Sequence, residues 1–296
     1  MHADPTQYAL AAAPTLAATL VLLADGTHTP IAGGTEIMVA LAAGRLQQKS
    51  LISINHLTEL RFIRIDDTTI TIGANTTFTD IRRNAQLAAD LPLLVQSASW
   101  TGSIANQNRA TLGGNICNAS PAADTPPALL AYNATVTLVS SGAAAGEIAQ
   151  RTIPYTDFHQ SYKRTALQPN ELLHSITIPR AYAAHQHFIR KVGTRNAQAI
   201  SKIALAAIAR LNENQTLTEV RLGAASLTDH PTRLYATERV LTNASFASAH
   251  FPNTLRQAQT ALASESHPID DIRSTARYRS AVAANLLEQF LRSLTV

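Results

Sequence analysis

The sequence contains a single cysteine, Cys117, among 296 residues. One thiol excludes an intrachain disulfide, a zinc site built from cysteines and an iron–sulfur cluster carried by this chain alone. Scarce cysteine is typical of a reducing compartment, and the residues after Met1 include neither a basic stretch nor a twin arginine. We therefore expect a cytoplasmic protein.

Long hydrophobic runs and concentrated charge are absent as well. The apolar run Leu16–Leu23 is too short to span a bilayer. Lys and Arg number 24 against 20 Asp and Glu, a net charge of +4, and only Arg82 and Arg83 are adjacent arginines. Because nucleic-acid-binding proteins concentrate their basic residues, the sequence favours neither nucleic acid nor membrane as a partner.

Motifs for hydrolysis or metal binding are also missing. The sequence has no Ser-His-Asp signature and no HExxH motif, so we expect no catalytic acid–base residue. His185 and His187 have the spacing of two metal ligands, but no third ligand follows nearby. We expect surface histidines there and no metal site.

The chain does have enough apolar sequence for a core, with 46% hydrophobic and 15% charged residues. Residues 1–55 predict a small lobe of alternating strands and helices. The predicted helices cover 16–23 and 36–43, and the predicted strands cover 29–32 and 51–54.

Residues 56–179 predict a second lobe, richer in strands, which Pro179 ends. The predicted strands are 62–65, 69–72, 135–140 and 173–178, with a turn at Asp66-Asp67 and a loop over 142–146 between the last two strands. The predicted helices are 78–83, 91–99 and 124–131.

Residues 180–296 predict a third region. A strand around 188–191 precedes an antiparallel hairpin of 203–211 and 217–224, and helices over 255–263 and 274–294 follow. The fold class is therefore α+β, with two lobes followed by an antiparallel sheet with packed helices.

Two glycine doublets stand out among only 12 glycines. Gly33-Gly34 and Gly113-Gly114 each follow an apolar residue and precede a hydroxyl or amide side chain. Residues without a Cβ allow backbone N–H groups to approach a ligand, so two such loops could cradle one pyrophosphate. A lone doublet is equally explained by a tight turn or helix cap, and neither fits G-x-G-x-x-G or the P-loop pattern.

The context of the second doublet is more specific. Residues 106–127, NQNRATLGGNICNASPAADTPP, resemble over their whole length the flavin signature of the molybdenum hydroxylases. Together with Ala32-Gly33-Gly34-Thr35-Glu36, they make the whole chain similar to the FAD-binding, or medium, subunit of the xanthine dehydrogenase and carbon monoxide dehydrogenase family. The resemblance implies a two-lobed FAD-binding fold of the vanillyl-alcohol-oxidase (PCMH) type over 1–55 and 56–179, and the family's C-terminal domain over 180–296.

The resemblance also implies the residues that hold FAD. Backbone amides of the first segment and the Thr35 hydroxyl would wrap the pyrophosphate, and Leu173 would pack against the isoalloxazine. Lys191 matches a lysine near the cofactor, where a cation favours the negatively charged reduced flavin. The implied set is Pro30, Ile31, Ala32, Gly33, Gly34, Thr35, Glu36, Ile37, Thr111, Leu112, Gly113, Gly114, Asn115, Asp124, Leu173 and Lys191.

Several positions keep two interpretations or depart from the family. Asp124 could also cap the helix after it, and Cys117 is expected to be a small buried residue. Thr101 stands where the animal xanthine enzymes carry an aromatic ring, and residues 196–199 lack the acidic pair those enzymes have near the flavin. Three arginines of the C-terminal region would either dock an acidic partner surface or form a solvated helix face: Arg273, Arg277 and Arg279.

The implied activity is electron transfer by an oxidoreductase subunit. FAD would lie on this chain, a molybdenum cofactor in a large partner subunit and two [2Fe-2S] clusters in a small one, assembled as a dimer of heterotrimers. Electrons would pass from the clusters through FAD to NAD or another acceptor. The alternatives are a standalone flavin oxidase or reductase and a scaffold that has lost FAD. The few aromatic residues of the C-terminal third favour the subunit.

Overall fold

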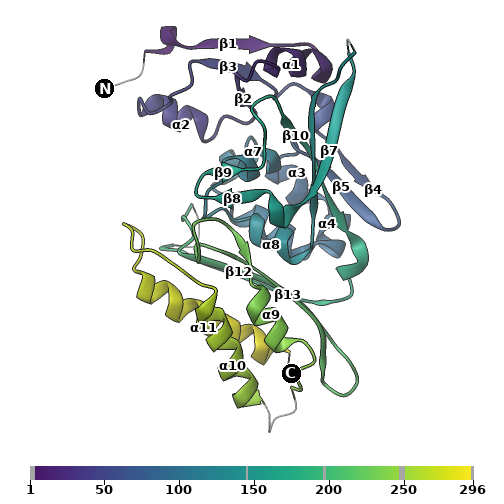
Figure 1. The fold of residues 1–296 in the computed structure, drawn as a ribbon, viewed down its shortest axis with the longest axis vertical. Coiled ribbons are helices and arrows are strands. Elements are labelled where there is room, and N and C mark those ends of the chain that lie inside the picture. The colour runs from purple at the N-terminus through teal and green to yellow at the C-terminus, as the bar shows by residue number, and fades with distance from the viewer. Residues whose placement is uncertain (1–3, 145, 196–197, 247–250, 295–296) are drawn as a thin grey trace.

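Three sheets follow one another along the long axis of the molecule in a computed structural model that describes residues 4–144, 146–195, 198–246 and 251–294 (Figure 1). The N-terminal sheet lies at the top of this view and the C-terminal helices lie at the bottom. This succession of mixed helices and sheets confirms the predicted α+β class.

The first sheet is parallel, with strand order β1-β3-β2. Its elements are β1 (Ala9–Ala12), α1 (Leu16–Leu23), β2 (Thr29–Ile31), α2 (Ile37–Ala42) and β3 (Ser50–Ser53). The Thr15 hydroxyl caps α1 by accepting the N–H of Ala18. Leu20 and Leu23 of α1 are fully buried in a cluster that also contains Leu172 of the second sheet, so the two sheets share packed residues.

The second sheet is antiparallel, with strand order β4-β5-β10-β6-β7. Its strands are β4 (Ile63–Ile65), β5 (Thr69–Gly73), β6 (Thr135–Ser141), β7 (Ile148–Pro154) and β10 (Leu172–Pro179), with the small hairpin β8 (His159–Ser161) and β9 (Arg164–Thr165) beside it. Its helices are α3 (Phe78–Arg83), α4 (Ala85–Asp90), α5 (Pro92–Trp100), α6 (Ile104–Gln107), α7 (Leu112–Cys117) and α8 (Pro126–Ala131).

Two turns of this sheet test the sequence interpretation. Asp66 accepts hydrogen bonds from the N–H groups of Thr68 and Thr69, which lower its pKa to about 2 and confirm the predicted β4–β5 turn. The loop predicted over 142–146 follows β6, but the sequence did not predict the next strand, β7, which pairs with β6. Most β7 residues are exposed, so the strand lacks the apolar alternation that would reveal it.

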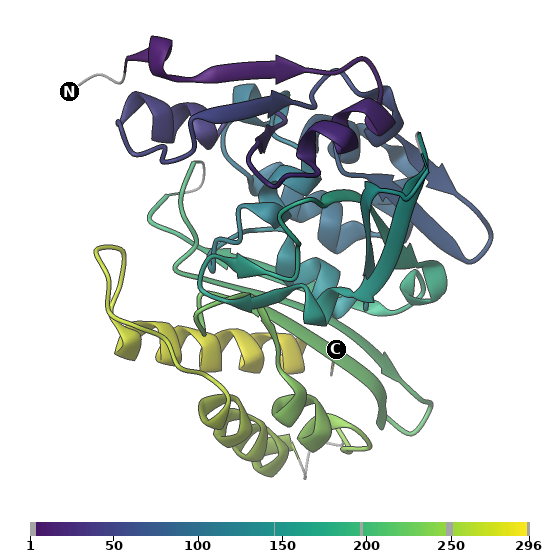
Figure 2. The same ribbon diagram turned by 45° about the horizontal axis from the view of Figure 1, so that its top comes forward.

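The third sheet is antiparallel, with strand order β11-β12-β13-β14. Its strands are β11 (Gln186–Val192), β12 (Ile203–Leu211), β13 (Leu217–Ala225) and β14 (Thr232–Arg233), and its helices are α9 (Tyr235–Leu241), α10 (Phe251–Ser264) and α11 (Ala276–Ser293). The predicted β12–β13 hairpin is confirmed. Figure 2 shows α10 and α11 covering the face of this sheet that points away from the rest of the molecule.

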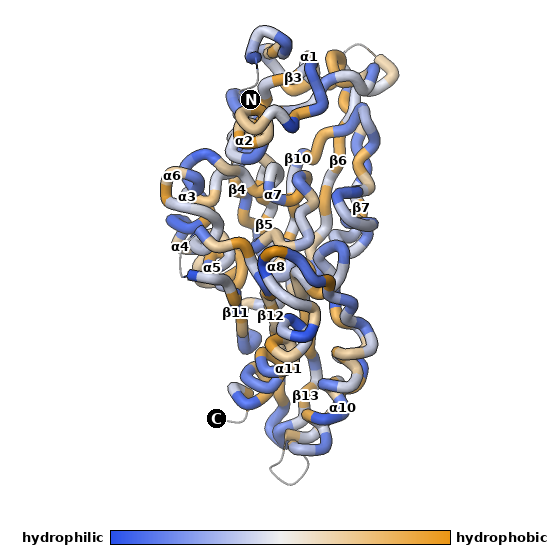
Figure 3. The backbone as a smooth tube through the Cα atoms, turned by 90° about the vertical axis from the view of Figure 1, so that its left-hand side faces the viewer, coloured by the Kyte–Doolittle hydropathy of each residue, from blue (hydrophilic) through white to orange (hydrophobic). Residues whose placement is uncertain are grey.

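The opposite face of the third sheet packs on α8, all six residues of which are buried. A Cβ on Gly223 of β13 would overlap the Pro127 carbonyl oxygen, so this close approach requires glycine. The hydropathy-coloured tube shows apolar stretches along the inner strands and α8, with hydrophilic stretches at the rim (Figure 3).

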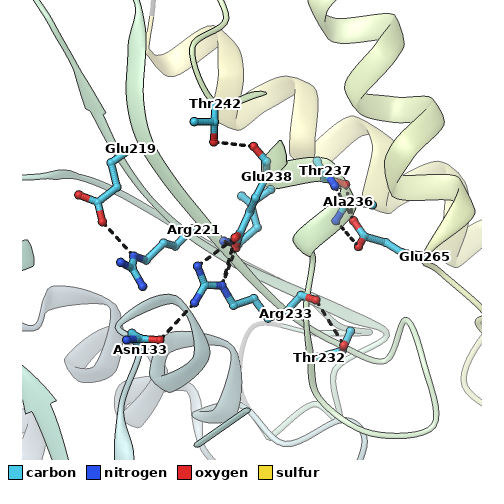
Figure 4. Close-up of polar contacts among 11 residues, drawn as sticks. Asn133, Glu219, Arg221, Thr232, Arg233, Ala236, Thr237, Glu238, Thr242 and Glu265 are labelled. Carbon is cyan, nitrogen blue, oxygen red and sulfur yellow. Dashed lines mark hydrogen bonds and ion pairs between the residues drawn. The ribbon is translucent and has the colours of Figure 1, made fainter. Parts of the chain in front are cut away.

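A buried ion pair stabilises the same junction (Figure 4). Arg233 contacts both carboxylate oxygens of Glu238, with a shortest distance of 2.8 Å, and also donates to Asn133 Oδ1 at 3.3 Å. Glu238 in turn accepts the backbone N–H of Leu222 at 2.7 Å. Since Asn133 follows α8, the pair connects the third sheet to the second region.

Two predictions about polar residues are wrong. His185 has a side chain only 6% exposed and lies 3.0 Å from Glu219, so it is not a surface histidine. His187 is partly buried beside Tyr132, with ring centroids 5.9 Å apart. Arg279 belongs to neither a solvated face nor an exposed docking surface, because it is 5% exposed and pairs with Asp271 at 2.6 Å.

Candidate functional site

The two glycine segments lie in contact. A Cβ on Gly33 would overlap the Arg109 carbonyl oxygen and lie 3.0 Å from Ala110 Cα, so only glycine fits. Arg109 also donates from Nε to the Gly33 carbonyl oxygen at 3.4 Å. Because Arg109 lies four residues before Gly113, the fold brings together two segments separated by about 80 positions of sequence.

The first segment runs from β2 into α2. Pro30 and Ile31 are in β2, the residues from Ala32 to Glu36 connect the elements, and Ile37 begins α2. Gly34 has φ +75°, a conformation that favours glycine. Among the described residues, none accepts a hydrogen bond from the N–H groups of Gly33, Gly34 or Thr35. These three consecutive donors therefore lack a partner within the described part of the chain, and Gly34 and Thr35 are also partly exposed.

The second segment differs from the predicted loop, because residues 112–117 form helix α7. The Thr111 hydroxyl caps this helix by accepting the Gly114 N–H at 3.0 Å. The N–H groups of Leu112, Gly113 and Asn115 bind the carbonyl oxygens of Thr76, Ala74 and Thr111. The segment therefore offers a surface without side chains at the exposed Gly114, rather than a set of free amides.

Gly113 and Gly114 have different environments. A Cβ on the buried Gly113 would lie 2.7 Å from Ala74 Cβ, so this glycine allows α7 to pack against the segment after β5. A Cβ on Gly114 would meet only Thr111 Oγ1, at 3.0 Å. The first glycine thus serves packing, and the second leaves room for a ligand.

Asp124 and Lys191 form an ion pair at the junction of the second and third regions. Lys191 Nζ lies 2.8 Å from Asp124 Oδ2 and 3.2 Å from the Trp100 carbonyl oxygen, and its side chain is only 10% exposed. Burial raises the pKa of Asp124, although the Lys191 charge and hydrogen bonds from Lys191 and Ser201 act to lower it. The alternative that Asp124 caps α8 is wrong, because that helix has no side-chain cap.

A hydrogen bond connects this pair to the second glycine segment. Thr125, the residue after Asp124, donates from its hydroxyl to Asn115 Oδ1 at 2.6 Å. Contacts therefore run without a break from Gly33 through α7 to Asp124 and Lys191. The structure brings together most of the residues that the sequence predicts to hold FAD.

Leu173 and Cys117 are placed differently from expectation. Leu173 is 4% exposed within the core cluster of the second region, so little of its surface is free for a flavin ring. Cys117 is exposed, which contradicts the prediction of a buried residue. Desolvation by the surrounding protein raises the pKa of its thiol to about 12, which favours the neutral thiol.

The sequence did not predict three residues that contact the candidate site. The Trp100 carbonyl oxygen accepts from Lys191, and the Ser201 hydroxyl donates to Asp124. Lys163, in the turn between β8 and β9, donates to the carbonyl oxygen of Asn118, and this hydrogen bond is 2.8 Å long. The only available signal was that Trp100 is the single tryptophan. Its neighbour Thr101 donates to the Ser97 carbonyl oxygen at the end of α5. The predicted departure at Asn196 and Ala197 lies outside the described residues.

Two family models match consecutive parts of the chain. Residues 6–181 match the FAD binding domain in molybdopterin dehydrogenase, and residues 188–294 match the CO dehydrogenase flavoprotein C-terminal domain. The xanthine dehydrogenase FAD-binding subunit of Escherichia coli O157:H7 is 32% identical over 237 residues, 78% of each chain. The glyceraldehyde dehydrogenase medium chain of Sulfolobus acidocaldarius is 26% identical over 280 residues, 94% of this chain and 95% of its own length.

A solved structure shows the same arrangement. Carbon monoxide dehydrogenase from Hydrogenophaga pseudoflava superimposes with a TM-score of 0.88 and 25% identity, covering 97% of this chain and 96% of that one. The chain belongs to the family of FAD-binding subunits of the xanthine and carbon monoxide dehydrogenase type. It is an oxidoreductase subunit whose cofactor is FAD, as the sequence resemblance implies.

The described residues fit that cofactor. The unpaired N–H groups of Gly33–Thr35 are donors of the kind that bind a diphosphate, and a Cβ at Gly33 would push the two segments apart. No helix within the described residues is both long and apolar enough to cross a membrane.

Proposed function

We propose that this chain transfers electrons for a heteromeric molybdenum hydroxylase, from [2Fe-2S] clusters of a small partner subunit to NAD or another acceptor by way of its FAD. A large partner subunit would carry the molybdenum cofactor, in a cytoplasmic dimer of heterotrimers. The observation that carries the proposal is the contact of Gly33 with Arg109, because it forms one site from both glycine segments in a chain of this family.

FAD supplies the redox chemistry when it is bound, and the chain positions it. The N–H groups of Gly33, Gly34 and Thr35 would bind the diphosphate, and Gly114 would allow the cofactor to approach α7 closely. Lys191, held by Asp124, would place a positive charge beside the flavin. The other residues of the implied set, Leu173 included, stay predictions.

The same proposal divides the chain into FAD-binding lobes over 1–55 and 56–179 and a C-terminal domain over 180–296. NAD is favoured over oxygen as the acceptor, and two of the relatives described above are named as dehydrogenases. The substrate would be chosen by the molybdenum subunit, so this chain leaves it open.

Purification with the products of neighbouring genes tests the proposal. We expect a yellow preparation with about one flavin per chain, copurifying with chains that contain molybdenum and iron. The chain alone should turn over no purine, aldehyde or heterocycle, and the complex should reduce NAD faster than oxygen. Turnover by the single chain would favour the standalone oxidase, and a colourless folded chain would favour the scaffold.

A further inference from the structure

Ser201 lies in the connection between β11 and β12 and has no exposed surface. Its hydroxyl donates to Asp124 Oδ1 at 2.7 Å, while the other oxygen of the same carboxylate accepts from Lys191. Lys191 is near the end of β11, and Ser201 comes just before β12. The Asp124 carboxylate therefore contacts a residue at each end of the connection between β11 and β12.

Ser201 is itself held in place from two directions. The Ser226 hydroxyl donates to the Ser201 carbonyl oxygen at 3.1 Å, and the Ser226 N–H donates to the Pro121 carbonyl oxygen at 2.8 Å. Since Pro121 lies three residues before Asp124, these hydrogen bonds close a ring through the chain. The Ser201 hydroxyl is thus fixed relative to the carboxylate that it binds.

Lys191 has one N–H donor that neither of its two contacts uses. An ammonium group has three N–H donors, and Lys191 uses two of them on Asp124 and the Trp100 carbonyl oxygen. The third has no acceptor among the described residues. The direction of this free donor is set by the two bonds already made, and one of these depends on the orientation of the Asp124 carboxylate.

We propose that Ser201 is a positioning residue, whose hydroxyl orients the Asp124 carboxylate so that it holds the Lys191 ammonium at the flavin. The inference rests on the proposed place of Lys191 beside the cofactor. An alanine at position 201 would leave one oxygen of a carboxylate that is 11% exposed without its donor. The carboxylate would then turn, and the ammonium would turn with it.

The experiment compares flavin midpoint potentials in the full chain loaded with FAD. A nearby positive charge stabilises the negatively charged reduced flavin, so Lys191→Ala should lower the potential. Ser201→Ala should lower it less, and Ser201→Thr, which retains a hydroxyl, should restore it. Ser201→Ala should also weaken FAD binding by about two- to tenfold, which is the equivalent of one hydrogen bond. The affinity is measured from the quenching by FAD of the fluorescence of Trp100, the single tryptophan.

Thr237→Val is the matched control. Thr237 has no exposed surface and donates its hydroxyl to the Glu265 carboxylate at 2.6 Å, within the cluster of Figure 4. Its replacement removes a buried hydroxyl from a carboxylate in the same way, and it should leave the flavin potential unchanged. A general loss of packing would affect both variants alike.

A double variant isolates the connection through Lys191. In the Lys191→Ala background, Ser201→Ala should produce no further shift, because nothing remains to be positioned. A full additional shift, or a shift of Ser201→Ala to higher potential, would overturn the inference. If Lys191→Ala shifts the potential but Ser201→Ala does not, Ser201 has no positioning role and the proposed place of Lys191 stands. If neither single variant shifts the potential, both the positioning role of Ser201 and the proposed place of Lys191 are wrong.

Discussion

Lys191 Nζ lies 2.8 Å from Asp124 Oδ2, so a strand of the third sheet and the segment before α8 share one ion pair. Both side chains are about one-tenth exposed. The sequence resemblance implies each residue separately as a neighbour of FAD. Their contact makes them a single unit, so the position of the Lys191 charge depends on the junction between two regions of the chain.

Removing one member of this pair should destabilise the chain. Lys191→Met would leave Asp124 buried without its cation, at a cost of about 3 kcal/mol in the free energy of unfolding. The double variant Lys191→Met/Asp124→Leu should recover most of that loss, because no buried charge remains. Urea unfolding of the two variants checks the difference, and equal stability would contradict an energetically important pair.

Gly33→Ala should abolish FAD retention, because its Cβ would overlap the Arg109 carbonyl oxygen and separate the two glycine segments. Gly44→Ala is the control, since a Cβ there meets nothing within 4 Å and only the φ of +65° imposes a cost of about 1 kcal/mol. Flavin absorbance per chain after gel filtration is the measurement. Full flavin content in Gly33→Ala would disprove the close contact.

The two glycines of the second doublet should respond differently to alanine. Gly113→Ala should lower stability through its clash with Ala74, even without FAD. Gly114→Ala should fold nearly as well as the unmodified chain, but bind FAD more weakly, because the new methyl group occupies an exposed surface of α7. Thermal unfolding with and without FAD separates the two effects. The assignment of Gly114 fails if the midpoint gain on adding FAD is unchanged.

Acid should destabilise the chain through the buried His159 and the partly buried His187. Burial and, secondarily, the charge of a neighbouring histidine lower the pKa values of His159 and His187 from 6.5 to about 4. Below pH 6.5 the unfolded histidine binds a proton that the folded one does not. The stability that each histidine contributes is therefore complete above pH 6.5 and falls as the pH drops towards 4, by at most about 3 kcal/mol for His159 and by less for His187, which water screens. His159→Gln should flatten this dependence in urea unfolding at pH 7.5, 6 and 4.5, whereas an unchanged slope would exclude His159 as a source.

Segments with a clear apolar pattern were predictable from sequence, including the short helix α3, whereas segments without such a pattern, such as β7 and α7, were not. The apolar run of β12 and the spaced leucines of α1 indicate their elements within a residue. Helix α7 contains two glycines in six residues, which no helix propensity favours. It forms because Thr111 caps it and because Gly113 packs on Ala74, a contact between segments almost 40 residues apart.

The site was predictable only as far as its motifs reach. The glycine segments, Asp124 and Lys191 lie in stretches whose residue types carry the family resemblance. The Ser201 hydroxyl donates to Asp124 and the Trp100 carbonyl oxygen accepts from Lys191, and the types of these two residues do not predict such contacts. Only the packing of the third sheet on the second region brings them within hydrogen-bonding distance.

The enclosure of α8 has a consequence for how this chain can be divided. The helix belongs by sequence to the part that matches the FAD-binding family model, yet the third sheet covers it, and Gly223 touches its backbone. A chain cut between residues 181 and 188 would expose Pro126–Ala131 to water in the N-terminal fragment and leave the remainder with an uncovered sheet face. We therefore expect the two parts that match separate family models to depend on each other for stability, because each covers apolar surface of the other.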